Sequence, residues 1–212
     1  PFAEEHPEMI SLATTIMNLG YNVFIPRIPP LKALIIKSEN VEWFARAYEQ
    51  IIHRDDVDQT NVAIIGISFG GSLLLKATLD ERIRSNPPRS MLMYGSYFDL
   101  ESGLNFLLTG EIEHEGKVQH IIPNDWGLTV MFHNFLKTVD AGFDTTHVEA
   151  VIAARVAEKL DEMEMLKAEL NEHDLVFIEA VLSGKCNPQI TKIAMAIMNI
   201  QKGPLRKISP SS

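Results

Sequence analysis

A glycine-rich stretch at residues 61–77 contains the side chain with the clearest capacity for covalent chemistry. Residues 66–70 read G-I-S-F-G, which matches the pattern G-x-S-x-G, and Gly71 follows. An apolar run of strand length comes directly before this pattern, and a helix-like run comes directly after it. A sharp strand-to-helix turn of this kind exposes a serine hydroxyl as a nucleophile. The stretch therefore predicts that Ser68 is a nucleophile, and an ordinary serine in a glycine-rich turn is the alternative.

The residues around Ser68 have predicted roles of their own. Gly66 and Gly70 are small enough for neighbouring backbones to pack closely around the turn. The helix that begins near Phe69 would direct its N-terminal N–H groups toward developing negative charge. We therefore expect the Phe69 N–H to donate to an oxyanion. A phosphate-binding loop is disfavoured, because the glycines fit neither G-x-x-x-x-G-K-[ST] nor G-x-G-x-x-G.

Helix-like and strand-like segments alternate in the first half of the chain. Apolar residues recur at helical spacing in residues 8–19 and 41–53, whereas residues 21–26, 61–67 and 90–96 are short apolar runs of strand length. This alternation is typical of βαβ units in a parallel sheet. We therefore predict the fold class α/β, with a partial doubly wound, mostly parallel sheet flanked by helices.

After Leu100 the pattern becomes helical, and no run reads convincingly as a strand. We therefore predict an all-helical cap after the sheet, with helices at residues 124–139, 146–170, 173–185 and 188–200. The acidic stretch at residues 111–120 does not have the H-E-x-x-H spacing of a zinc site. A solvated loop is the prediction there, and no metal site is expected.

Three segments of the first half resemble the α/β-hydrolase family. Residues 12–31 resemble the family's first helix and the strand after it, residues 61–77 its nucleophile elbow, and residues 89–100 its next strand. The helical half resembles the cap that many members insert at this point. The resemblance implies an α/β core and a helical cap.

The resemblance also assigns domain limits. It implies a partial core at residues 1–103, a helical cap at residues 104–207 and the start of a return to the core at residues 208–212. In the family the nucleophile precedes an acid and then a histidine. This order places both partners of Ser68 beyond Ser212, so we expect the chain to be an inactive fragment with exposed strand edges.

Two weaker site assignments depend on the same resemblance. The family's oxyanion turn would lie just before Pro1, which makes Phe2 and Ala3 its candidate remnants. Asp99 follows a predicted strand, where a minority of members carry the acid, although an aspartate that caps the next turn is the favoured alternative. His133 and His147 fall in the predicted cap, where surface or packing roles are favoured.

The predicted function is that of a serine hydrolase acting on an ester-like or other acyl bond. Carboxylic ester hydrolysis, as in an esterase or a lipase-like enzyme, is the favoured class, and the expected partner is a small, apolar acyl substrate. No cofactor is expected. An acyltransferase, a peptidase and a non-catalytic hydrolase-like binding protein remain alternatives.

Charge and composition disfavour other classes of protein. The net charge is −9 without a basic stripe, so a nucleic-acid surface is not expected. No apolar run approaches the ~18 residues of a membrane span. The single cysteine, Cys186, excludes an internal disulfide and favours a reducing, cytoplasmic compartment, with a lost signal peptide left open.

Overall fold

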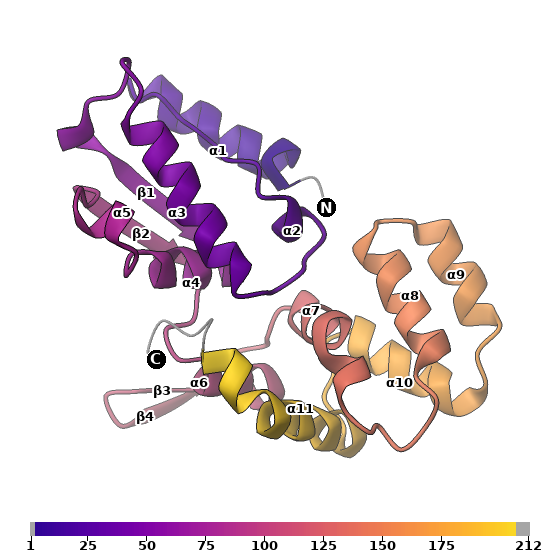
Figure 1. The fold of residues 1–212 in the computed structure, drawn as a ribbon. Helices are drawn as coiled ribbons and strands as arrows, with labels where there is room; N and C mark the ends of the chain where they lie inside the picture. The colour runs from indigo at the N-terminus through magenta and orange to yellow at the C-terminus, as the bar shows by residue number, and fades with distance from the viewer. Residues whose placement is uncertain (1–2, 207–212) are drawn as a thin grey trace. The chain divides into compact units, whose positions relative to one another are not determined.

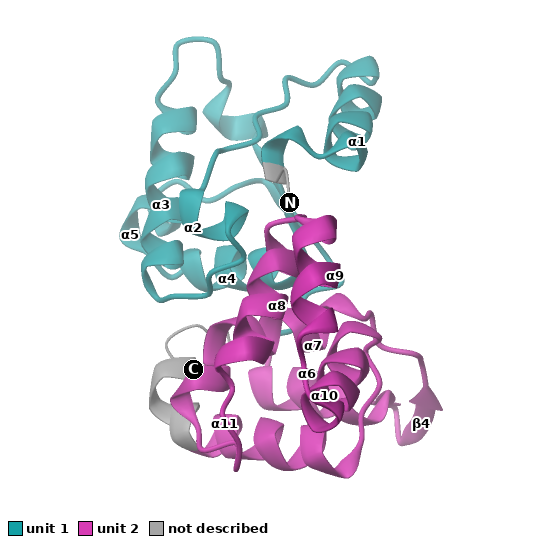
Figure 2. Ribbon diagram, turned by 90° about the vertical axis from the view of Figure 1, so that its right-hand side faces the viewer, with its two compact units in different colours: residues 1–98, 207–212 teal, residues 99–206 magenta. Residues whose placement is uncertain are grey.

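The computed structural model describes residues 3–206, and the surroundings of side chains within residues 4–199. The chain divides into two compact units. One ends at Phe98, and the other spans Asp99–Arg206 (Figure 2). The sequence placed the end of the core at residue 103, whereas the two units meet between Phe98 and Asp99. Phe2 and the predicted return at residues 208–212 lie outside the described residues. Ala3 begins a short 3-10 helix, η1.

The first unit contains helices and one pair of strands (Figure 1). Its elements are η1 (Ala3–Glu5), α1 (Pro7–Asn18), α2 (Pro29–Lys32), α3 (Glu39–Ile52), η2 (Gln59–Asn61), β1 (Ala63–Ile67), α4 (Ser68–Ala77), α5 (Glu81–Arg84) and β2 (Ser90–Tyr94). Strands β1 and β2 are parallel, and their register pairs Ile65 with Leu92. Helix α4 packs against α3 and against both strands, so it holds one face of the pair.

The two faces of the β1–β2 pair differ in burial. Ile64 contacts the core cluster formed by α3, α4 and α5, whose buried members are Ala45, Tyr48, Ile52, Ala77 and Ile83. Alternate residues of a strand point to opposite faces, so Ile65 and Leu92 lie on the other face. These two side chains are 41% and 59% exposed. Among the described residues, the core of the first unit therefore lies on one side of the strands.

The predicted doubly wound, mostly parallel sheet is wrong. The described residues form two separate two-stranded sheets, one parallel and one antiparallel, among many helices. Residues 21–26, predicted as a strand, run as coil. Their apolar, β-branched sequence favours an extended conformation, but a strand also requires a hydrogen-bonded partner, which local sequence does not specify. Pro26 also lacks the N–H that a ladder would use.

The second unit is mostly helical and contains one exposed hairpin. Its elements are α6 (Leu100–Thr109), β3 (Glu111–His114), β4 (Lys117–His120), α7 (Trp126–Phe135), η3 (Leu136–Thr138), α8 (Thr146–Val156), α9 (Leu160–Ala168), α10 (Glu172–Leu182) and α11 (Pro188–Arg206). Phe132 of α7 and Phe177 of α10 are fully buried, and their rings meet edge to face at 5.5 Å. Within residues 3–206, no helix combines the length and the apolar character that crossing a membrane requires.

Two predictions for the second unit need correction. Residues 111–120 form the β3–β4 hairpin rather than a loop, so the unit is not all-helical. Glu115 and Gly116 both have positive φ, at 51° and 74°, which suits a two-residue hairpin turn. The single helix predicted over residues 146–170 is interrupted at Glu158, where φ is 57°. A right-handed helix cannot continue through that conformation, so α8 and α9 are separate.

Candidate functional site

Ser68 stands at the junction between β1 and α4. Strand β1 ends at Ile67, α4 begins at Ser68, and Ser68 has a φ of +54°. Residues other than glycine rarely adopt this left-handed conformation, which costs about 1–3 kcal/mol unless the surroundings enforce it. The residue is also exposed. The turn therefore presents a strained serine to solvent at the start of a helix.

Close approach of β1 and α4 leaves no room for side chains at two glycines. A Cβ atom on Gly66 would lie 2.5 Å from Met93 Sδ and 2.6 Å from Gly71 Cα. A Cβ atom on Gly71 would lie 2.8 Å from the Gly66 carbonyl carbon and would overlap Ser96 Oγ. Such contacts are far below van der Waals separation, so both positions require glycine.

Gly70 has different surroundings. A Cβ atom there would meet Leu31 Cδ1 at 4.0 Å, which is an ordinary contact. The close approach that the G-x-S-x-G pattern assigned to Gly70 therefore lies at Gly71, one residue further along α4. Gly70 instead leaves space on the first turn of the helix, two residues from the exposed serine.

Two serines connect the loop after β2 to the turn. Ser96 Oγ donates to the carbonyl oxygen of Ser68 at 2.8 Å. The Ser72 hydroxyl, which is fully buried on α4, donates to the Tyr97 carbonyl at 2.7 Å and accepts from the Tyr97 N–H at 2.9 Å. Burial raises the pKa of the Tyr97 phenol to about 12. Residues 96 and 97 therefore form hydrogen bonds both to the backbone of Ser68 and to a side chain of α4.

The sequence pattern did not identify Ser72 or Ser96. Their partners lie 25 and 28 residues away in the chain, so nothing local marks them. The available signal was a polar residue in the otherwise apolar run of α4, because a hydroxyl buried in such a run needs a hydrogen-bond partner.

The first turn of α4 begins without a side-chain cap. The first N–H groups of a helix have no partner within the helix. Ile67, the N-cap residue, makes no side-chain capping bond among the described residues. The Phe69 N–H therefore belongs to a group of donors at the positive end of the helix dipole. This placement, next to Ser68, suits an oxyanion.

Asp99 lies in the second unit, where it caps a helix. It is the N-cap of α6, and its Oδ2 accepts from the Ser102 N–H at 2.8 Å. Such a cap is worth about 1 kcal/mol. This bond matches the alternative in which the aspartate caps the next turn.

The two histidines of the first unit bond to backbone groups near their own helices. His6 Nδ1 accepts from the Glu8 N–H at 3.2 Å, and His53 Nδ1 donates to the Glu49 carbonyl at 2.8 Å. Both histidines thus form hydrogen bonds with backbone groups at the ends of helices, His6 at the start of α1 and His53 at the end of α3. His133 and His147 lie on α7 and α8 of the second unit.

A histidine–aspartate pair that the sequence did not reveal occurs in the second unit. His173 Nδ1 lies 2.9 Å from Asp174 Oδ1, and His173 Nε2 lies 2.9 Å from Gln189 Nε2. Asp174 also receives a bond of 2.8 Å from Asn171 Nδ2, and the Asp174 N–H donates back to Asn171 Oδ1. Since Asn171 is the N-cap of α10, this group closes the start of that helix.

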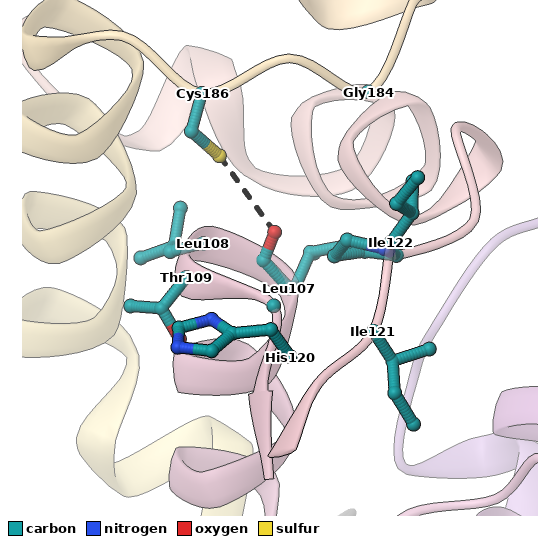
Figure 3. Close-up of a pocket in the computed structure, with 10 residues that line it drawn as sticks. Leu107, Leu108, Thr109, His120, Ile121, Ile122, Gly184 and Cys186 are labelled. Carbon is teal, nitrogen blue, oxygen red and sulfur yellow. Dashed lines mark hydrogen bonds between the residues drawn. The ribbon is translucent and has the colours of Figure 1, made fainter. Parts of the chain in front are cut away.

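A small pocket of about 280 Å³ also belongs to the second unit (Figure 3). Apolar side chains of Leu107, Leu108, Ile121 and Ile122 dominate its lining. The thiol of Cys186 donates to the Leu107 carbonyl at 3.7 Å, and burial raises its pKa. No group of metal-ligating side chains occurs within the described ranges.

Comparison with protein-family models, with curated proteins and with solved structures found no match to the chain.

Proposed function

We propose that this chain carries the nucleophile of a serine hydrolase that cleaves an ester-like acyl bond. Ser68 is the nucleophile, and the Phe69 N–H is one donor to the oxyanion. The observation that carries the proposal is the backbone of Ser68, whose φ of +54° holds an exposed hydroxyl between β1 and the start of α4. The resemblance of residues 61–77 to the nucleophile elbow of the α/β-hydrolases supports the proposal for the turn itself.

The proposed chemistry begins with attack of Ser68 Oγ on the acyl carbonyl carbon. The hydroxyl proton passes to a general base, which in enzymes with this turn is a histidine. The carbonyl oxygen becomes an oxyanion, and the donors at the start of α4 stabilise it. Collapse of the tetrahedral intermediate breaks the ester bond, the base returns its proton to the leaving alkoxide oxygen, and the neutral alcohol departs from an acyl-serine. Water then hydrolyses the acyl-serine.

Strain at Ser68 has a physical use in this scheme. A serine at the start of a helix with negative φ would lie among the helical side chains, whereas the left-handed conformation turns its side chain away from both the strand and the helix. Gly66 and Gly71 permit this turn because they let β1 and α4 approach each other closely. The backbone energy stored at Ser68 is therefore consistent with a reacting group rather than a spacer.

The direct test is covalent labelling of the protein, expressed from its complete reading frame, with a fluorophosphonate. We expect one adduct, located at Ser68 by mass spectrometry and absent in Ser68→Ala. Ser38→Ala is the matched control. Ser38 is also exposed and stands at the start of a helix, as the N-cap of α3, but it has an ordinary φ of −58°. Equal labelling of the wild type and Ser68→Ala would refute the proposal and favour a binding protein.

A further inference from the structure

The hydrogen bond from Ser96 Oγ to the Ser68 carbonyl constrains a second group. The Ser68 carbonyl and the Phe69 N–H belong to the same peptide unit, which is planar. That peptide bond is trans, since the described residues contain no cis bond. In a trans unit the C=O and the N–H point in opposite directions. A bond of 2.8 Å that holds the Ser68 oxygen therefore also sets the direction of the Phe69 N–H.

Ser96 is itself held in place. It follows β2, and its hydroxyl also lies 3.4 Å from the Tyr94 carbonyl. The next residue, Tyr97, is bound through its backbone N–H and C=O to the buried hydroxyl of Ser72. The Ser96 hydroxyl occupies the space that a side chain on Gly71 would take. Contacts with the end of β2 and with α4 thus hold the Ser96 hydroxyl in place.

We propose that Ser96 is a positioning residue for the oxyanion donor, an inference that rests on the proposed role of Ser68. Its hydroxyl pins the Ser68 carbonyl behind the turn, so that the Phe69 N–H faces the space in front of it. The requirement for glycine at position 71 follows from the same arrangement, because the Ser96 hydroxyl needs that space.

The expected size of the effect is set by the geometry of oxyanion holes. A donor acts when it lies about 2.7–3.1 Å from the oxyanion, and loss of one donor lowers kcat by about 10²–10³-fold. Ser96→Ala would misdirect the Phe69 N–H without removing it. We therefore expect a loss of about tenfold, smaller than the loss of the whole donor.

The experiment compares the wild type with Ser96→Ala, Ser96→Thr and Ser102→Ala in the protein from the complete reading frame. Ser102→Ala is the matched control, because the Ser102 hydroxyl also donates to a backbone carbonyl, that of Asp99, at 2.9 Å. The readouts are kcat and KM on p-nitrophenyl acetate, the rate of fluorophosphonate labelling, and the amide resonance of Phe69.

In Ser96→Ala we expect kcat and the labelling rate to fall about tenfold, with KM unchanged. The Phe69 amide resonance should shift and its hydrogen exchange should accelerate. Ser96→Thr, which keeps the hydroxyl, should restore all three properties, and Ser102→Ala should match the wild type. If Ser96→Ala does not fold, Ser96→Cys, which has a weak donor of similar size, should show the same losses.

A wild-type labelling rate in a folded Ser96→Ala or Ser96→Cys variant would overturn the inference. So would an unchanged Phe69 amide resonance, which can be read even in a protein without activity. Failure of the proposed function is a separate result, because it would appear as labelling of Ser68→Ala at the wild-type rate.

Discussion

Gly66 on β1 and Gly71 on α4 lie in backbone contact, since a Cβ atom on Gly66 would come within 2.6 Å of Gly71 Cα. This contact sets how closely the helix follows the strand, and it leaves the residue between them, Ser68, little choice of backbone conformation. The strain at the serine and the absence of side chains at the two glycines are thus parts of one turn.

The three glycines of the turn should respond differently to a methyl group. Gly66→Ala and Gly71→Ala should each lower the free energy of unfolding by about 1–3 kcal/mol, the usual cost of overpacking. Gly70→Ala should be neutral or stabilising by up to about 1 kcal/mol, because alanine favours a helix and the nearest atom, Leu31 Cδ1, leaves room. Urea unfolding measures all three. An equal loss at position 70 would contradict the packing described above.

Relief of the strain at Ser68 should stabilise the protein. In Ser68→Gly the release of about 1–3 kcal/mol of backbone strain exceeds the entropic cost of glycine, about 0.5–1 kcal/mol, so the free energy of unfolding should rise by about 1 kcal/mol. Ser38→Gly is the control, because Ser38 has negative φ and offers no strain to relieve. The melting temperatures of the two variants, measured by calorimetry, test the difference. A lower melting temperature for Ser68→Gly would argue that the serine is unstrained.

Removal of the Ser72 hydroxyl should weaken the first unit. Ser72→Ala leaves the Tyr97 N–H and carbonyl without their buried partner, which costs about 1–3 kcal/mol. Ser85→Ala removes an exposed hydroxyl that donates to Glu81 Oε1, so its effect should stay within about 0.5 kcal/mol. Urea unfolding of both variants gives the comparison, and equal effects would show that the Ser72 bonds contribute little.

Acid should remove one electrostatic contribution to the stability of the first unit. Hydrogen bonds from Arg82 lower the pKa of Glu42 from 4.5 to about 2 and that of Asp80 from 3.8 to about 2. Because the folded values are depressed, the stabilisation is fully present above the ordinary values of 4.5 and 3.8. It disappears as the pH falls toward about 2. The charges are partly exposed, so the effect should be modest.

The measurement is the melting temperature of wild type and Arg82→Gln across that range of pH. The two should differ most near neutral pH and converge toward about pH 2. Arg84→Gln, on the same short helix but with an exposed contact of 3.8 Å to Glu81, should differ little from the wild type at any pH. A difference for Arg82→Gln that is independent of pH would assign its role to packing.

The turn at Ser68 was readable from the sequence because its determinants are local. A strand-length apolar run, glycines at fixed offsets and a helix-forming run lie within residues 61–77, and the structure forms β1 and α4 there. The sheet could not be read in the same way, because residues 21–26 have a strand-like sequence yet form no strand with the other described residues. Strand pairing joins distant segments, and periodicity within one segment carries no information about its partner.

Other differences between prediction and structure come from residues whose backbone conformation is unusual for their type. Glu115 and Glu158 both adopt positive φ, one in the hairpin turn and one between α8 and α9. Glutamate gives no sequence signal for either, in contrast to asparagine or glycine. Ser96 is similar, since its role follows from a carbonyl that only the folded chain brings within 2.8 Å.

The proposed nucleophile, Ser68, belongs to the unit that ends at Phe98, and Cys186, the one cysteine of the sequence, belongs to Asp99–Arg206. Under the proposed function, a phosphonate dye would label Ser68 in the first unit, and a maleimide dye would label Cys186 in the second, without any engineered residue. The energy transfer between such a pair of dyes would report the separation of the units in solution.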